Sequence, residues 1–216
     1  MTGGFLENLG AAESAWRQQM VRRRYGRDEP IFHEGEIGDT FHVIEKGRVL
    51  IEVSTARGDV AALAVRGPGE VLGELAIVSE GRRNAKVTAL EPTETLSITQ
   101  SRLDDLRRAD AAVDRRLLEI LAAKLQETMD QLMEVLFIPV ETRVLRVVLR
   151  LADAFDNGST PVVVRVRQED IAAMAGTRRQ TANRPLKAAE AEGAIVVGRG
   201  RVEILDRDLL ERLAGS

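Results

Sequence analysis

One uninterrupted stretch, residues 111–136, constrains the fold of this chain more than any other. It reads AAVDRRLLEILAAKLQETMDQLMEVL, contains neither Gly nor Pro, and is rich in Leu, Ala, Glu and Gln, which are strong helix formers. At about 1.5 Å per residue such a helix would be about 40 Å long, which is more than one small domain needs. We therefore expect one long helix with a domain at each end.

Apolar residues recur along this helix at alternating steps of three and four. Such a series is a heptad seam, the pattern by which two helices pair, and its one polar member is Thr128. Leu117, Ile120 and Met129 widen the apolar stripe, so the alternative is an ordinary helix that covers a domain of its own chain. We interpret the stretch as the dimerisation helix of a homodimer. The seam consists of Leu118, Leu121, Leu125, Thr128, Leu132 and Val135.

The composition excludes several classes of protein. The 216 residues can hold one large domain or two small ones, and there is no cysteine, which rules out disulfides, cysteine-ligated metal centres and a cysteine nucleophile. No apolar run approaches the ~18 residues of a membrane span, and residues 1–10 lack a signal-peptide pattern. The net charge of −3 provides no overall basic field for nucleic acid. We expect a cytoplasmic protein that does not associate with a membrane.

Residues 31–98 have the pattern of short strands joined by glycine-rich turns. A short helix is expected before them, within residues 5–20. Regularly spaced short strands with such turns predict an all-β barrel or jelly roll. The expected strands are residues 41–44, 49–53, 61–65, 87–90 and 95–98.

The segment GELAIVSEGRRNA, residues 73–85, interrupts this pattern. Gly73 lets the backbone approach a ligand closely, and a helical turn beginning at Glu74 would direct its first N–H groups at an anion. Arg83 can fork onto a phosphate, whereas the Glu74 carboxylate can accept a hydrogen bond from a ribose hydroxyl. These groups together suggest a nucleotide site. The alternative is a chance Gly-Glu-Leu with Arg83 as a surface charge.

The C-terminal half begins at Pro139. Proline disfavours helix at the residue before it and suits the first turn of the next helix, so Pro139 marks a domain boundary, either a fixed corner or a hinge. Beyond it we expect a helix at residues 140–154, a strand at 160–167, a short helix at 168–175, a second helix to about residue 192, and a hairpin at 195–204. Helix, Gly176 turn, helix and β wing predict a winged helix-turn-helix.

The start of the second helix carries a basic cluster. Residues 176–187, GTRRQTANRPLK, contain four basic residues and no acid. Arg179, Gln180 and Arg184 have spacings that share one helix face, and this end of the helix enters the major groove in such motifs. The alternative is a solvated basic helix end.

Two local features bear on the shape of this second helix. Thr177 and Gln180 match a capping box, which predicts that Thr177 starts the helix. Pro185 lies inside it and removes an N–H donor, so we expect the helix to be bent or irregular there.

These motifs carry a resemblance to a known family. Residues 73–76 and 83–85 resemble the phosphate-binding cassette of cyclic-nucleotide-binding domains, and residues 36–49, EIGDTFHVIEKGRV, resemble the early strands of the same domain. Over residues 5–213 the chain is similar to bacterial regulators of the cyclic AMP receptor protein (Crp/Fnr) family. The resemblance implies an α+β fold with a cyclic-nucleotide-binding β-roll at 1–110, a dimerisation helix and hinge at 111–138, and a winged helix-turn-helix DNA-binding domain at 139–216.

The resemblance also implies roles for individual residues. Glu74 would bind the ribose 2′-hydroxyl of cyclic AMP or cyclic GMP, an allosteric effector, and Arg83 would bind its cyclic phosphate with the N–H groups of the residues after Glu74. Thr128 would touch the purine. The cassette set is Gly73, Glu74, Leu75, Ala76, Arg83, Asn84, Ala85 and Thr128.

At the other end, the family resemblance implies contact with double-stranded DNA at a near-palindromic operator, with RNA polymerase as a further partner. Arg179, Gln180 and Arg184 match the base-reading positions, whereas Arg167, Gln168 and Lys187 suit phosphates. The DNA-binding set is Arg167, Gln168, Arg178, Arg179, Gln180, Thr181, Arg184 and Lys187.

The sequence departs from the family pattern at four positions. Asn84 replaces the usual Ser or Thr, which leaves cyclic AMP and cyclic GMP as alternatives. Met129 replaces a Ser beside the purine. Gln180 replaces the common Glu, and Gln prefers adenine where Glu accepts from cytosine. Arg167 replaces a helix-capping Thr.

Two rival functions remain. One is the same DNA-binding architecture with a different effector, such as haem or an organic acid, or with none. His33 and His42 are the only histidines, and neither lies in a cluster that predicts a metal site. The other is an enzyme that uses the nucleotide pocket, for which the sequence offers no nucleophile–base pair. We expect neither catalysis nor a metal.

Overall fold

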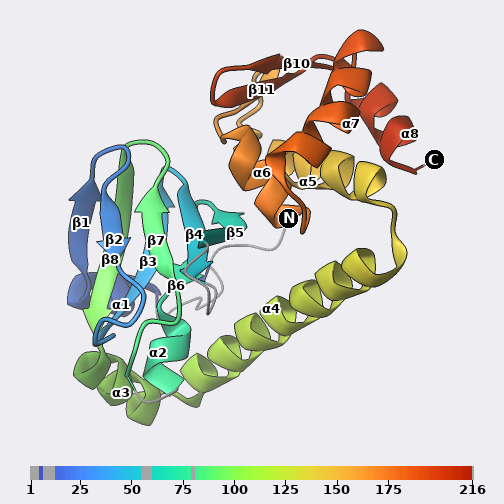
Figure 1. Cartoon of the computed structure of the whole chain (residues 1–216). Coiled ribbons are helices and arrows are strands. Elements are labelled where there is room, and N and C mark those ends of the chain that lie inside the picture. Colours follow the sequence, from blue (N-terminus) through green and yellow to red (C-terminus); the bar gives the residue numbers. More distant parts are fainter. Residues whose placement is uncertain (1–4, 7–12, 55–59, 79–80, 216) are drawn as a thin grey trace. The chain divides into compact units, whose positions relative to one another are not determined.

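A computed structural model of the chain describes residues 5–6, 13–54, 60–78 and 81–215. Its contacts divide the chain into two compact units. The first comprises Met1–Gly58 with Arg66–Glu127, and the second comprises Asp59–Val65 with Thr128–Ser216. Both contain helices and strands (Figure 1), which confirms the predicted α+β class.

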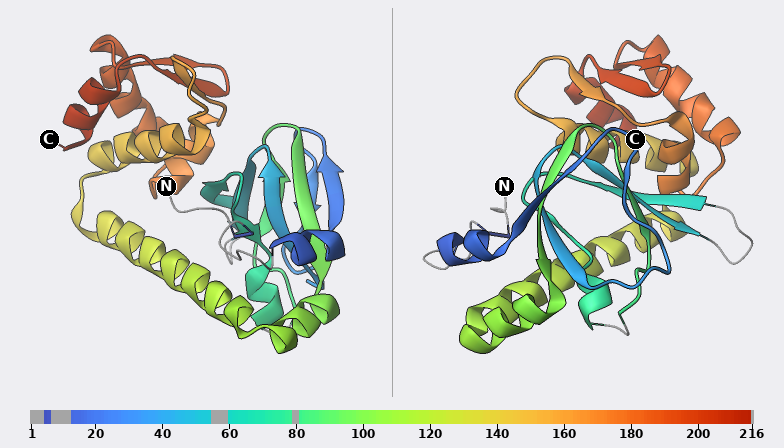
Figure 2. Two further views of the ribbon diagram at one scale, coloured as in Figure 1. Left: turned by 180° about the vertical axis from the view of Figure 1, so that it is seen from behind. Right: turned by 90° about the vertical axis from the view of Figure 1, so that its left-hand side faces the viewer.

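Two four-stranded antiparallel sheets form the roll of the N-terminal half (Figures 1 and 2). The strand orders are β1-β8-β3-β6 and β2-β7-β4-β5. The five predicted strands are confirmed as β3, β4, β5, β7 and β8, whereas β1, β2 and β6 were not predicted. The strands are β1 (Val21–Tyr25), β2 (Pro30–Phe32), β3 (Thr40–Lys46), β4 (Val49–Ser54), β5 (Val60–Arg66), β6 (Val71–Leu72), β7 (Lys86–Ala89) and β8 (Thr93–Thr99).

Successive side chains of β3 and β8 alternate between the two faces of their sheet, and the two faces have different surroundings. Phe41 and Val43 join a cluster with Trp16 and Leu117 on the helical side of the sheet. Because successive side chains point to opposite faces, His42 lies on the other face and is in contact distance of Phe32 in the second sheet. The space between the two sheets is therefore partly polar.

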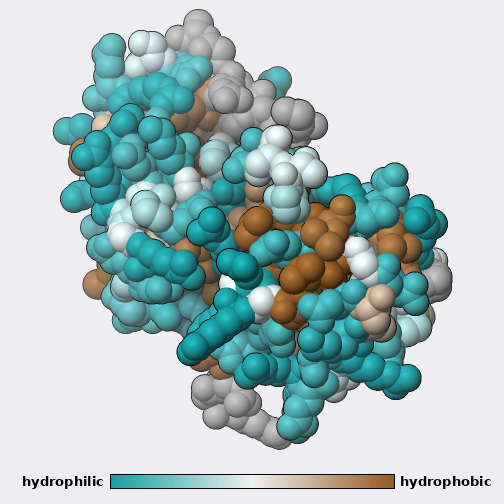
Figure 3. Space-filling model, turned by 90° about the horizontal axis from the view of Figure 1, so that it is seen from above, coloured by the Kyte–Doolittle hydropathy of each residue, from teal (hydrophilic) through white to brown (hydrophobic). Residues whose placement is uncertain are grey.

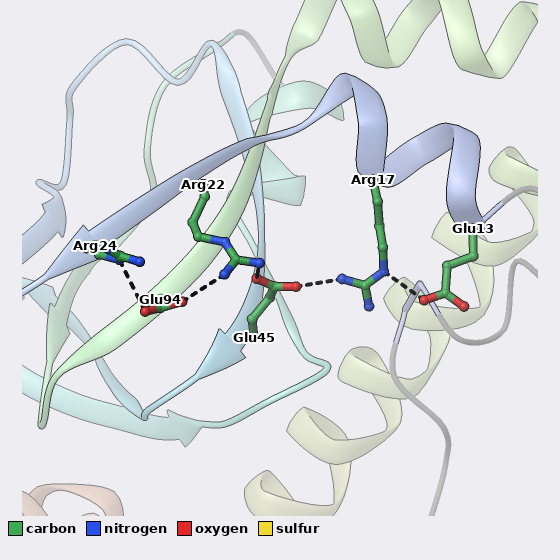
Figure 4. Close-up of polar contacts among 6 residues, drawn as sticks. All are labelled: Glu13, Arg17, Arg22, Arg24, Glu45 and Glu94. Carbon is green, nitrogen blue, oxygen red and sulfur yellow. Dashed lines mark hydrogen bonds and ion pairs between the residues drawn. The ribbon is translucent and has the colours of Figure 1, made fainter.

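A ladder of alternating charges joins α1 (Glu13–Gln19), the described part of the predicted N-terminal helix, to the edge strand β1 (Figure 4). Glu45 lies between Arg17 at 2.5 Å and Arg22 at 2.8 Å. Exposed pairs of this kind contribute little each, but charges on an edge strand discourage pairing with another chain. The ladder runs Glu13, Arg17, Glu45, Arg22, Glu94, Arg24.

The predicted long helix is confirmed as α4 (Ala111–Phe137), one residue longer than expected. It follows α3 (Gln100–Ala109), which was not predicted, and α2 (Glu74–Val78) lies beside its first turns (Figure 1). Val113 and Leu117 are buried against the N-terminal sheet, so the first turns of α4 complete that core. None of the helices in the described part of the chain is both long and apolar enough to cross a membrane.

The second unit is a winged helix-turn-helix, as predicted. Its three-stranded sheet has the order β10-β11-β9, and α5 packs against α6, α7 and α8. The buried face of α5 includes Val144, Leu145, Val148 and Leu151. The elements are α5 (Val140–Phe155), β9 (Val162–Val164), α6 (Gln168–Met174), α7 (Arg179–Ala191), β10 (Ile195–Gly198), β11 (Arg201–Ile204) and α8 (Arg207–Gly215), of which α8 was not predicted.

The predicted capping box at Thr177 is wrong. Arg178 is the N-cap of α7 and makes no side-chain capping bond. Thr177 instead closes the end of α6, since its N–H donates to the Ala172 carbonyl at 2.9 Å and the Gly176 N–H donates to Ala173 at 2.9 Å. This is the paired-bond C-terminal motif that glycine with positive φ permits, and Gly176 has a φ of +64°.

Pro185 does not interrupt α7, which continues through it from Arg179 to Ala191, and the predicted bend stays a prediction. Proline removes one backbone donor. Pro185 is nevertheless buried on the inner face of α7 with Ala182 and Leu186, so packing of the ring offsets part of that loss.

The junction between α4 and α5 is held by one arginine. Pro139 is the N-cap of α5, as expected for a proline between two helices, whereas the two compact units divide earlier, between Glu127 and Thr128 of α4. The Arg143 guanidinium donates to the carbonyls of Val135 at 3.2 Å and Ile138 at 2.9 Å at the end of α4, and to Ala175 at 3.0 Å after α6. Three carbonyls that a helix end would leave without donors are thereby satisfied.

Candidate effector site and nucleic-acid interface

Arg83 is the most unusual charge in the first unit, because it is only 4% exposed. Its Nη2 donates to the carbonyl and to the hydroxyl of Thr40, both at 2.8 Å. Its guanidinium carbon lies 4.1 Å from the centre of the Phe32 ring, within the range of a cation–π contact. Contacts from β2 and β3 thus hold the guanidinium in one place.

The charge of Arg83 is not matched by a carboxylate. Among the residues that the structure describes, no acid pairs with its guanidinium, and its Nε has no hydrogen-bond partner. Burial lowers the pKa of Arg83 although the charges of Asp39, Glu36 and Glu74 oppose the shift, so the nearby carboxylates offset only part of the cost of removing this cation from water. A buried cation with an unused N–H fits an anionic ligand.

Two glycines leave room for this side chain. A Cβ on Gly73 would lie 2.1 Å from Arg83 Nη1, and one on Gly38 would lie 2.4 Å from Ala76 Cβ and 3.0 Å from Arg83 Nε. Gly73 also has a φ of +83°, which other residues adopt only with strain. The lack of a side chain at Gly73 therefore allows Arg83 to approach the backbone closely, and the approach of a ligand to Gly73 stays a prediction.

Glu74 lies at the start of α2, where its side chain is buried. Lys124 of α4 donates to Glu74 Oε1 at 2.8 Å and to the Val71 carbonyl at 3.1 Å. A carboxylate offers two oxygens, so Oε2 is left as an acceptor. Lys124 was not predicted as a site residue, although it lies four residues before Thr128 and so shares its side of the helix.

A cavity of about 460 Å³ opens beside Lys124, a volume typical of small-molecule sites. Its walls include Arg66, Glu70 and Glu127, and Arg66 forms ion pairs with both acids. Arg83 does not line this cavity. This cavity is therefore separate from the buried cation.

The remaining cassette residues differ in exposure. Ala76 and Ala85 are buried, Leu75 is partly exposed, and the Asn84 side chain faces solvent. Gly73, Ala76 and Arg83 are brought together, as the contacts with Gly38 show. Thr128 is exposed on α4 and belongs to the second unit, and residues 79–80 of the cassette lie outside the described part. Within that part, no three acidic or histidine side chains are grouped as for a metal ion.

The first turns of α7 present exposed cations. Arg178, Arg179 and Arg184 are exposed, and within the described ranges none of them pairs with a carboxylate. Gln180 and Thr181 are exposed beside them. Ala182 and Leu186 on the opposite side are buried, so packing fixes the helix while its polar face is available. The surface seen in Figure 3 is mostly hydrophilic, with apolar residues gathered in limited areas.

The residues expected on phosphates are already paired. Arg167 is the N-cap of α6 but makes no side-chain capping bond; its Nε lies 2.9 Å from Asp170, and Lys187 lies 2.6 Å from Glu190. Gln168 is half-buried at the start of α6. To reach DNA phosphates, Arg167 and Lys187 would have to bond a carboxylate and a phosphate together, or give up the carboxylate for the phosphate.

Comparison with known families agrees with the two units. The model of the cyclic nucleotide-binding domain matches residues 22–110, and that of the Crp-like helix-turn-helix domain matches residues 142–213. The first match covers both β3 and the cassette, and the second covers α6, α7 and the wing.

Individual relatives match over most of their length. The chain is 34% identical to the cyclic AMP receptor protein of Thermus thermophilus, over 89% of this chain and 88% of that protein. It is 30% identical to a CRP-like cAMP-activated global transcriptional regulator of Mycobacterium tuberculosis, over 94% and 92%. The crystal structure of the Thermus thermophilus catabolite activator protein is similar with a TM-score of 0.55 and 32% identity, covering 98% of each chain.

Substitution of two positive-φ glycines by alanine separates backbone strain from crowding of Arg83. At Gly35, with a φ of +82°, an added Cβ would have nothing within 4 Å, whereas at Gly73, with a φ of +83°, it would meet Arg83. We expect Gly35→Ala to lower the free energy of unfolding by about 1 kcal/mol through backbone strain, and Gly73→Ala to lower it by at least about 2 kcal/mol more. Urea denaturation measures both, and equal losses would contradict the packing seen at Gly73.

Proposed function

Because this chain belongs to the Crp/Fnr family of DNA-binding transcription regulators, we propose that it acts as a homodimer with a cyclic mononucleotide as effector. The family consists of regulators rather than enzymes. The observation that carries the effector proposal is the buried Arg83, which has no carboxylate partner among the described residues and an unused Nε donor. An anion at this position would relieve the cost of the buried charge.

The cassette offers a distinct partner for each part of the effector. Arg83, with the N–H groups of Leu75 and Ala76, suits the cyclic phosphate. Glu74 Oε2 can accept from the ribose 2′-hydroxyl while Oε1 stays with Lys124. The names of the relatives from Thermus thermophilus and Mycobacterium tuberculosis favour cyclic AMP as the purine nucleotide.

The dimer proposal rests on the exposed side of α4. Leu118 is 67% exposed and Leu125 is 62% exposed. The heptad seam continues with Thr128, Leu132 and Val135. Helix seams of this kind are stable when a second helix covers them, and contiguous apolar surface of this kind marks an interaction site on a soluble protein. The alternative, a helix that covers a domain of its own chain, applies to the first turns of α4, where Leu117 is buried, and not to these exposed positions.

Two reading heads related by a dimer axis would contact two half-sites about one helical turn apart. In each head, Arg179 and Arg184 suit guanine edges and Gln180 suits adenine. This assignment agrees with the exposure of all three side chains on the first turns of α7.

The effector is tested by calorimetric titration with cyclic AMP and with cyclic GMP. We expect one of them to bind the wild-type protein and Arg83→Ala to weaken that binding at least about 100-fold, because charge-assisted bonds to the phosphate are lost. Arg82→Ala is the matched control, since Arg82 is the exposed neighbour, and it should change the affinity less than about threefold. No heat with either nucleotide, from folded protein, would indicate a different effector or none.

The dimer is tested by one charge placed on the seam. Leu125→Glu should raise the dimer dissociation constant at least about 100-fold, because each chain loses a buried leucine and gains a buried charge. Gln126→Glu adds the same charge on the adjacent, outward side of α4 and should leave association nearly unchanged. Sedimentation velocity over a range of concentrations measures both. Equal association of the two variants would assign the interface to another surface.

The reading head is tested by selecting operators from random DNA. Gln180→Glu should change the preferred base at one position in each half-site, since glutamate accepts from cytosine N4 where glutamine pairs with adenine. Lys187→Gln should instead weaken binding of all sequences alike, as expected for a phosphate contact. An unchanged consensus for Gln180→Glu would remove Gln180 from the base-reading set.

A further inference from the structure

A continuous series of hydrogen bonds leads away from Arg83 through the polar space between the two sheets. Arg83 Nη2 donates to Thr40 Oγ1 at 2.8 Å. His42 lies between two threonines, with Nε2 3.2 Å from Thr40 Oγ1 and Nδ1 3.2 Å from Thr95 Oγ1. We call this series the relay: Arg83, Thr40, His42, Thr95.

The direction of the relay follows from its first member, because an arginine can only donate. Thr40 Oγ1 accepts from Arg83, so its own proton needs an acceptor. Among the described residues, His42 Nε2 is the acceptor that the Thr40 hydroxyl reaches. His42 then carries its proton on Nδ1 and donates it to Thr95.

We propose that His42, as the neutral Nδ1–H tautomer, is a positioning residue that holds the Arg83 guanidinium in place through Thr40. The proposal rests on the proposed function of Arg83 as the phosphate-binding residue. His42 does not touch the ligand. His42 fixes the Thr40 hydroxyl so that the oxygen lone pairs face Arg83. The guanidinium is then held with its Nε directed at the anion.

The surroundings of His42 favour its neutral form. His42 hydrogen-bonds Thr40 and Thr95 and lies near the Phe32 ring. In the sheet, Leu72 of β6 and Ser97 of β8 lie opposite it. Burial, followed by the charges of Arg83 and Arg23, lowers the pKa of His42 to about 4. A proton on Nε2 would put a second donor against Thr40 and a third cation beside the two arginines.

Linkage gives the sign of the pH dependence. Above the ordinary histidine pKa of 6.5, His42 is neutral in both the folded and the unfolded chain. As pH falls from 6.5 towards 4, the unfolded chain takes up a proton that the folded protein does not, so folding is progressively disfavoured. Within the same pH range the relay stays intact in the protein that remains folded.

The tautomer can be observed directly, because the chain has only two histidines. Nitrogen-15 NMR of the ligand-free protein at neutral pH should show His42 with a protonated Nδ1 and an unprotonated Nε2. His33 is the other histidine, and its signals can be assigned separately by substituting it. A His42 that is protonated on Nε2, or that takes up a second proton close to pH 6.5, would overturn the proposal.

The positioning effect is tested with three variants. His42→Phe keeps a ring but removes the acceptor for Thr40, and we expect about tenfold weaker binding of whichever of cyclic AMP and cyclic GMP binds the wild type. His42→Gln restores an acceptor near the place of Nε2 and should bind within about threefold of wild type. Ser97→Ala removes another buried hydroxyl from β8, one that bonds the Val21 carbonyl outside the relay, and should have no effect on affinity.

A ligand-free readout separates this proposal from the effector proposal. Restricted rotation of the Arg83 guanidinium should give separate Nη signals in the wild type, Ser97→Ala and His42→Gln proteins, and merged signals in His42→Phe. If neither nucleotide binds wild-type protein, the effector proposal fails while these signals still decide the role of His42. Separate Nη signals in folded His42→Phe, or unchanged nucleotide affinity of that variant, would show that His42 does not position Arg83.

Discussion

The fold depends on one helix that has to be covered on two sides. The first turns of α4 bury Val113 and Leu117 in the core of the N-terminal unit, so the β-roll is incomplete without them. Later turns carry Leu125 and Leu132 outward, where more than half of each side chain is exposed. Burial of apolar area is the main stabilising contribution in folding and association. The same helix therefore completes the roll and leaves a surface that favours a second copy of the chain.

The effector site is built around a charge that the folded chain stabilises only in part. Arg83 is buried by the crowding of Gly38, Gly73 and Phe32 and bonded to neutral acceptors. Neutral acceptors lower the cost of a buried cation but do not cancel its charge. The anionic effector proposed above would supply what is missing, and part of its binding energy would then come from relieving this cost. Functional sites commonly retain such a cost in stability.

The sequence predicts the elements whose pattern is local. Heptad spacing gives α4, short apolar runs between glycine-rich turns give β3 and β8, and the helix–glycine–helix order gives the reading head. Strand β1 was missed because VRRRY lacks apolar alternation; pairing with β8 and the charge ladder of Figure 4 hold it instead. The start of α7 was misplaced because the end of α6 takes up Thr177. Lys124 and His42 hydrogen-bond Glu74 and Thr95, which are 50 and 53 residues away. Such contacts depend on strand register and helix rotation that local patterns do not contain.

The distribution of contacts along α4 indicates how the two proposed sites can influence each other. In the first unit, Lys124 joins α4 to the cassette through Glu74. In the second unit, two contacts join the last turns of α4 to the reading head. Arg143 bonds the Val135 and Ala175 carbonyls. Glu134 forms an ion pair with Arg150 at 2.9 Å. A ribose hydroxyl at Glu74 would change the charge that Lys124 meets, and hence the preferred position of the helix it belongs to. Because coupling requires an element whose equilibrium both sites bias, α4 is the part of this chain that can satisfy that requirement.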